Sequence, residues 1–150
     1  MAQENAHTST LLQKLKRAQD FETFVEKNEG AMLNTTFSAY LSELCAERNL
    51  VPERIIKAAQ IDRTYGHQLF NGTRKPSRDK VIQLAFGFGM TVEEAQQLLR
   101  AAEKPPLYPK IKRDAAILFC LAKKMNVLEA QNLLASLDLT LLGGDWQHGE

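Results

Sequence analysis

Hydrophobic residues recur along most of this chain at intervals of three and four residues, the spacing that places side chains on one face of an α-helix. The pattern is clearest near the middle, where Ile55, Ile56 and Ala59 share a face of one short helix and Leu69 and Phe70 share a face of the next. The pattern predicts an all-α protein. The predicted helices cover residues 9–18, 21–27, 37–48, 52–60, 63–71, 78–88, 92–102, 113–124 and 127–137.

Polar residues, glycines and a proline stand where these helices should begin and end. A side-chain oxygen at a helix start can accept a backbone N–H bond, and Pro52 suits a first turn because its missing N–H would be unbonded there. Glu94 should complete a capping box with Thr91. The expected N-caps are Asp20, Thr35 or Thr36, Asp62, Ser77 and Thr91. The expected helix ends are Asn28 to Gly30, Asn49, Asn71-Gly72, and Gly87 with Gly89.

The second half of the chain repeats itself with an offset of about 35 residues. The matches pair Arg78-Asp79 with Arg113-Asp114, Ile82 with Ile117, Met90 with Met125, Val92 with Val127, Glu94-Ala95-Gln96 with Glu129-Ala130-Gln131, and Leu98-Leu99 with Leu133-Leu134. A period of this length is typical of one repeated supersecondary unit. Such units bury their apolar faces by stacking, so the second helix pair should extend the core of the first.

A proline-rich connector and an apolar tail flank the second helix pair. Residues 104–109 (KPPLYP) cannot be helical, and a stiff spacer is favoured over a proline-rich recognition peptide. Residues 139–142 (LTLL) read as a docked, strand-like end, followed by a loose terminus that contains Trp146. The expected organisation is a helical extension (1–34), a central domain (35–103), and the connector with the repeated pair (104–150) on the same core.

The N-terminal extension has an apolar face made by Leu11, Leu12 and Leu15. It could pack on the rest of the chain or form a seam between two copies. Packing within one chain is favoured, because exposing both Phe21 and Phe24 would be costly.

Composition places the chain among ordinary globular proteins. It has 150 residues, of which 44% are hydrophobic and 25% charged. There is no long uncharged apolar run and no apolar leader near Met1, so we expect a cytoplasmic protein. Cys45 and Cys120 lie in apolar helical patterns and are expected to be buried small hydrophobes.

Positive charge concentrates on one stretch, although the formal net charge of the chain is only +1. Between residues 51 and 80 the acids are Glu53, Asp62 and Asp79, while the bases are Arg54, Lys57, Arg63, Arg74, Lys75, Arg78 and Lys80. Such a local excess of bases is the pattern of a nucleic-acid contact.

The stretch from about residue 37 to 99 resembles the Cro-type (XRE) helix-turn-helix repressors. The similarity lies in the helix pair 52–60 and 63–71, the NGTRKPS segment at 71–77, and the apolar helix that follows. It implies an all-α, lambda-repressor-like helix-turn-helix bundle. It also implies a sequence-specific transcriptional regulator that binds double-stranded DNA, normally as a homodimer on half-sites about one helical turn apart.

DNA binding assigns roles to particular side chains. The helix 63–71 should enter the major groove, and bidentate bonds could join Arg63 to guanine and Gln68 to adenine. The expected base contacts are Arg63, Thr64, His67 and Gln68. The expected phosphate contacts are Asn71, Arg74, Lys75, Arg78 and Lys80. The 9–18 helix or the last helix pair could form the dimer surface.

The chain departs from the family pattern at four positions. Repressors of this type usually have alanine at position 56, glycine at 60 and an aliphatic residue at 66, and often glutamine at 52. Here these are Ile56, Gln60, Gly66 and Pro52. Ile56 and Gly66 should face each other, so the large side chain would fill the space that the glycine leaves. Gln60 would be strained if the turn is left-handed.

Other kinds of chemistry find little support. His7, His67 and His148 are far apart, neither cysteine has a neighbour at ligand spacing, and no metal or cofactor site is expected. No catalytic constellation or phosphate-cradling glycine loop is present, so we do not expect an enzyme. The alternative to DNA binding is a protein-interaction module on the same fold, which the near-neutral net charge and the residues at positions 52 and 66 favour.

Overall fold

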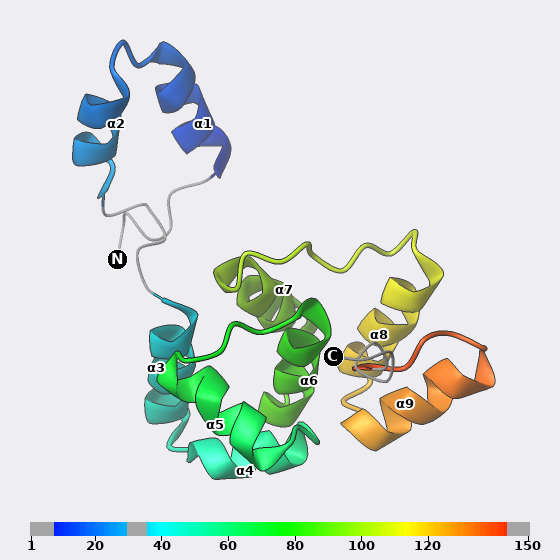
Figure 1. The fold of residues 1–150 in the computed structure, drawn as a ribbon. Helices are drawn as coiled ribbons and strands as arrows, with labels where there is room; N and C mark the ends of the chain where they lie inside the picture. Colours follow the sequence, from blue (N-terminus) through cyan, green and yellow to red (C-terminus); the bar gives the residue numbers. More distant parts are fainter. Residues whose placement is uncertain (1–7, 30–35, 144–150) are drawn as a thin grey trace. The chain divides into compact units, whose positions relative to one another are not determined.

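The computed structural model describes residues 8–29 and 36–143, and all regular secondary structure in these ranges is helical (Figure 1). The helices are α1 (Thr8–Arg17), α2 (Phe21–Lys27), α3 (Phe37–Arg48), α4 (Pro52–Ala58), α5 (Arg63–Asn71), α6 (Arg78–Phe88), α7 (Val92–Ala101), α8 (Lys112–Ala122) and α9 (Val127–Ser136). The predicted all-α class is confirmed. Thr35 and Trp146 lie outside the described residues.

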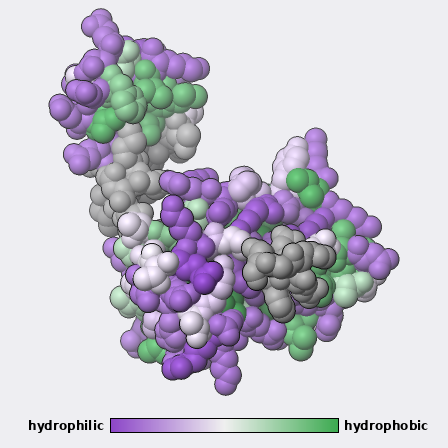
Figure 2. Space-filling view, in the orientation of Figure 1, coloured by the Kyte–Doolittle hydropathy of each residue, from purple (hydrophilic) through white to green (hydrophobic). Residues whose placement is uncertain are grey.

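The chain divides into two compact units, residues 1–35 and 36–150. In the first, α1 and α2 contact each other, and hydrophobic side chains gather in the middle of the pair (Figure 2). Phe24 is 5% exposed and Phe21 is 66% exposed, so contacts between α1 and α2 bury Phe24 but not Phe21. Packing of the extension on the rest of the chain stays a prediction.

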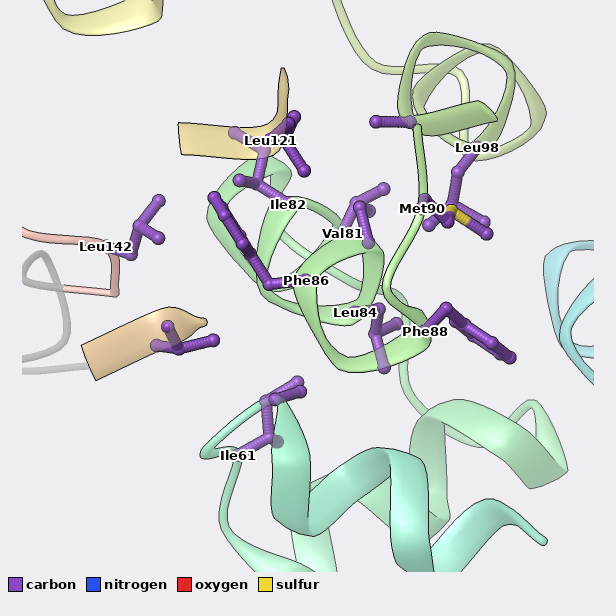
Figure 3. Close-up of a cluster of buried hydrophobic side chains, with 14 of the residues drawn as sticks. Ile61, Val81, Ile82, Leu84, Phe86, Phe88, Met90, Leu98, Leu121 and Leu142 are labelled. Carbon is purple, nitrogen blue, oxygen red and sulfur yellow. The ribbon is translucent and has the colours of Figure 1, made fainter. Parts of the chain in front are cut away.

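The second unit is built around α6. Every residue from Val81 to Phe86 is buried, so this helix has no solvent-facing stripe over its middle turns. Figure 3 shows the hydrophobic side chains around it, which come from α7 (Leu98), from α8 (Leu121) and from the segment after α9 (Leu142). The two cysteines belong to this core, and burial raises the pKa of both thiols.

Helix ends follow the local chemistry that the sequence predicts. Asp20, Thr36, Asp62, Ser77 and Thr91 each accept a backbone N–H bond as N-cap residues, and the Thr91–Glu94 capping box is present.

Gly87 does not end α6, contrary to expectation. It lies inside the helix, and a Cβ atom there would be 2.7 Å from the carbonyl oxygen of Ile55 and 3.0 Å from Cβ of Ala59. Its lack of a side chain therefore lets α4 lie close against α6. The chain leaves the helix at Gly89, which has a left-handed φ of 67°.

The contact predicted between Ile56 of α4 and Gly66 of α5 is confirmed. A Cβ atom added to Gly66 would overlap Cγ2 of Ile56 and would lie 2.7 Å from its Cγ1 and 2.9 Å from its Cδ1. The turn between these helices passes through Gln60, whose φ of 57° lies in the left-handed region. A non-glycine residue is strained there, as the sequence suggested.

The two repeated helix pairs have the same internal hydrogen bonds. In the first pair, Gln96 exchanges two hydrogen bonds of 2.8 Å with the backbone of Leu107. In the second, Gln131 bonds the backbone of Leu142 in the same way, at 3.0 and 2.8 Å. Both leucines are buried, so the connector is a packed part of the repeat and more than a spacer. The tail docks as expected up to this point, but without forming a strand.

Reciprocal ion pairs join the two helix pairs. Nη2 of Arg78 lies 2.9 Å from Oδ2 of Asp114, and Nη2 of Arg113 lies 3.0 Å from Oδ2 of Asp79. Positions 78 and 79 correspond to 113 and 114, so exchanging the two helix pairs converts one ion pair into the other. The pairs are therefore related by an approximate two-fold rotation, and Lys124 and Gly89, a third set of equivalent positions, also bond each other at 3.0 Å.

Candidate nucleic-acid interface

Helix α5 has one buried face and one exposed face. Leu69 and Phe70 are buried, while Arg63 and Thr64 are exposed and His67 and Gln68 are half-buried. The side chain of Asp62 accepts the backbone N–H of Tyr65 and so fixes where the helix begins. The residues predicted to contact bases thus lie on the solvent side of α5, where a partner could reach them.

Arg63 has an acidic partner on the preceding helix. Its Nε atom donates to Oε1 of Glu53 at 2.6 Å, and Nε2 of His67 lies 3.7 Å from Oε2 of the same carboxylate. The hydrogen bond and the charge of Arg63 lower the pKa of Glu53 below its usual value. The arginine keeps 75% of its side chain exposed, so water and other anions can compete for it.

Tyr65 lies between two cations of the loop and of α6. The guanidinium carbon of Arg74 is 4.5 Å from the centre of the tyrosine ring, and Nζ of Lys80 is 5.4 Å from it. Cation–π contacts of this kind restrain long flexible side chains. Nε of Arg74 also donates to Oε1 of Gln68 at 2.9 Å, which ties the loop to the exposed face of α5.

Arg74 is held in place and still has free donors. Within the described residues its Nη1 and Nη2 groups make no hydrogen bond, and its side chain is exposed. Lys75 is exposed beside it. Asn71 accepts bonds from Thr73 through Oδ1, which leaves its amide NH2 group to donate. These side chains have the donors that phosphate contacts require.

The predicted phosphate contact by Arg78 does not fit the structure. Its guanidinium donates to both carboxylate oxygens of Asp114 and to the carbonyl oxygens of Pro105 and Pro106. Four of its five N–H groups are therefore used to join the helix pairs. Arg113, the equivalent residue of the second helix pair, makes the same bonds to Asp79 and to the carbonyls of Thr140 and Leu141.

A hollow of about 920 Å³, whose lining includes both basic residues and the acids Asp62 and Asp79, adjoins the loop. Tyr65, Arg74 and Lys80 line one part of it, and Arg113 and Gly143 of the second helix pair line another. Positive side chains in a concave site attract anions more strongly than the same charges on a flat surface.

The part of the chain that the structure describes holds neither a cluster of metal ligands nor a helix that could span a membrane. No group of three or more His, Cys, Asp or Glu residues lies close enough there to hold a metal ion. Among residues 8–29 and 36–143, no helix has the length and apolarity needed to cross a bilayer.

Comparison of the chain with protein-family models, with curated proteins and with solved structures gave no match. No matched protein therefore indicates which residues of this chain are functional. Two residues of the candidate interface, Glu53 and Tyr65, were missed as site residues by the sequence analysis. Tyr65 was taken only as an apolar residue of α5, and pairing between Glu53 and Arg63 across a turn has no pattern in the sequence.

Proposed function

We propose that the protein binds double-stranded DNA through α5 and the loop that follows it, and acts as a transcriptional regulator. The observation that carries the proposal is the hydrogen bond between Gln68 and Arg74, because it makes the exposed face of α5 continuous with the cationic loop. A helix that reads bases needs neighbouring phosphate contacts to fix its register. Resemblance to the Cro-type repressors supports the same role and the expected homodimer. The cytoplasmic location expected from the sequence stays a prediction.

In this proposal, two kinds of contact have separate residues. The base edges are contacted by Arg63, Thr64, His67 and Gln68. Arg63 exchanges its bond to Glu53 for a bond to guanine. The phosphate contacts are made by Asn71, Arg74, Lys75 and Lys80. The ring of Tyr65 positions Arg74 and Lys80. Arg78 is excluded because it joins the helix pairs.

The test is a fluorescence-anisotropy titration with random-sequence duplex DNA at low and moderate salt. The variant is Arg74→Ala/Lys75→Ala, and the matched control is Arg100→Ala/Lys110→Ala, which removes two exposed charges from α7 and the connector. We expect wild-type binding to weaken steeply with salt. The loop variant should reduce the slope of log K against log salt by about 2, while the control leaves it unchanged.

The alternative is a protein-interaction module that does not bind DNA. The pairing of Arg63 with Glu53 favours it, because this bond neutralises a candidate base reader. Absence of binding at low salt, or equal binding by the loop variant and the control, would decide for the alternative.

A further inference from the structure

Helix α8 is apolar on two opposite faces. One face carries Ile117, Cys120 and Leu121 and is buried in the core. The other carries Phe119, which is 49% exposed, and Ile111, which is 51% exposed. A helix that is apolar all round is normally covered all round. We define the α8 face as the outer stripe Ile111, Ala115, Leu118, Phe119 and Ala122, which all lie within about 100° around the helix axis.

The approximate two-fold relation shows how the equivalent face of α6 is covered. Phe119 and Ala122, both exposed, correspond to Leu84, which is buried, and to Gly87, which is half-buried. Helix α4 lies on this side of α6, so close that a side chain at Gly87 would meet Ala59. The structure therefore contains one helix seated on this face in the first pair. Within residues 36–143, Ile111, Phe119 and Ala122 of the matching α8 face are exposed.

The α8 face differs from its counterpart by becoming more apolar. At the positions of α8 that are equivalent to Lys80 and Gln83 of α6, the chain has Ala115 and Leu118. Gln83 donates to the carbonyl oxygen of Ala59 at 3.1 Å, a bond specific to the end of α4. Ala115 and Leu118 are half-buried, and Leu118 packs against the core, so the exposed apolar area of the face comes from Ile111 and Phe119. Neighbouring exposed apolar side chains of this size mark a surface that is buried in a complex.

Lysines follow one edge of the α8 face. Lys112 and Lys123 lie next to Phe119 around the helix, and Nζ of Lys123 is 5.7 Å from the centre of the phenylalanine ring. The one acidic residue of α8, Asp114, is buried on the other side under Arg78. α8 itself therefore has two positive charges and no acid on this edge.

We propose that the α8 face binds an amphipathic helix of a partner protein. The partner helix lies on α8 as α4 lies on α6, with small and branched apolar residues against Phe119 and acidic residues facing Lys112 and Lys123. This is the helix-on-groove mode of recognition. A second copy fits less well, because in a two-fold antiparallel helix pair the same edges meet, and Lys112 of one copy would face Lys123 of the other. The proposal does not depend on DNA binding.

The test uses a displayed library of helical peptides against the full chain. An Ile-Ile-Ala stripe is fixed at the spacing of Ile55, Ile56 and Ala59, and the flanking positions vary among Glu, Lys and Gln. Selection is run on the wild type, on Phe119→Asp, and on the charge reversal Lys112→Glu/Lys123→Glu. The matched control is Leu12→Asp, which alters a residue of similar exposure, 47%, in the N-terminal unit. Circular dichroism confirms that each variant is folded.

We expect the wild type and Leu12→Asp to enrich peptides with glutamate on one flank. These peptides should bind Phe119→Asp at least about tenfold more weakly, and the charge reversal should select lysine instead. Two outcomes overturn the proposal. The first is a selection result, in which the wild type enriches no peptides relative to Phe119→Asp, or the charge reversal selects peptides with the same flanking residues as the wild type. The other, seen by light scattering, is a dimer of the wild type that Phe119→Asp dissociates and Leu12→Asp does not, which would assign the face to a second copy.

Discussion

Glu53 holds the guanidinium of Arg63 at 2.6 Å, so the arginine best placed to read a guanine already has an acidic partner. Any DNA complex that uses Arg63 must first break this bond and leave the carboxylate near the negatively charged duplex. Both side chains are largely exposed to solvent, so the pair contributes little to stability. Its effect should therefore appear in DNA affinity.

Replacing Glu53 with glutamine tests this competition. We expect Glu53→Gln to tighten DNA binding about three- to tenfold at low salt, because Arg63 is released and one negative charge is removed from the interface. Anisotropy titration measures the change, and Glu47→Gln serves as a control, because Glu47 is an exposed acid on α3. Unchanged affinity in Glu53→Gln would mean that Arg63 takes no part in binding.

The fit between Ile56 and Gly66 predicts a coupled stability effect. Gly66→Ile should lower the free energy of unfolding by about 1–3 kcal/mol, since its side chain would overlap that of Ile56. Adding Ile56→Ala to Gly66→Ile should recover part of the loss, although Ile56→Ala alone costs about 2–5 kcal/mol. Urea denaturation of the four proteins gives the coupling energy. Strictly additive losses would show that the two residues do not share one space.

The left-handed turn residue offers a stabilising substitution. Gln60→Gly should raise the free energy of unfolding by up to about 1 kcal/mol, because glycine adopts a φ of 57° without strain. The weak bond of 3.5 Å from Gln83 to the carbonyl of residue 60 is kept, as it involves only the backbone there. Thermal melting checks the result. A lower melting temperature would indicate that the Gln60 side chain contributes more than the strain removes.

Asp114 should make stability depend on acid pH. Burial opposes its ionisation, but hydrogen bonds from Arg78 and from the backbone N–H of Tyr108 lower its pKa below the ordinary 3.8. A carboxyl whose pKa is lower in the folded state stabilises the fold at higher pH. That contribution is lost as the pH falls below 3.8 towards the folded pKa.

Asp114→Asn should therefore destabilise the protein at pH 7 by about 3 kcal/mol or less, because a partly buried arginine loses its charged partner. The difference from the wild type should shrink as the pH is lowered below 3.8. Urea denaturation curves recorded at about five pH values between about 2 and 7 measure both effects. A difference that is constant over this range would mean that the carboxyl titrates alike in the folded and unfolded chains.

Most of the fold could be predicted from sequence because local rules decide it. Asp62, Ser77 and Thr91 begin helices through bonds to residues three positions on, and such bonds leave a pattern in the sequence. The repeat and the contact between Ile56 and Gly66 were equally visible, the first as an offset and the second as two compensating departures from a family pattern.

What could not be predicted depends on contacts between distant residues. Arg78 looked like one more base of the cationic loop, and only its contacts with residues 105, 106 and 114 assign it to the core. Gly87 looked like a helix end, because the closeness of α4 has no local signal. At the candidate site the exposed face of α5 was anticipated, while the ion pair to Glu53 and the stacking on Tyr65 required the fold.

The reciprocal ion pairs have a consequence for how this chain can change. In a symmetric homodimer, one gene specifies both halves, so a substitution that suits one half is imposed on the other. Here the two halves are encoded separately, and positions 83 and 84 can hold Gln83 and Leu84 while 118 and 119 hold Leu118 and Phe119. Because both halves belong to one chain, a substitution in one half leaves the sequence of the other unchanged. One half can remain fitted to α4 while the other diverges towards a different neighbour.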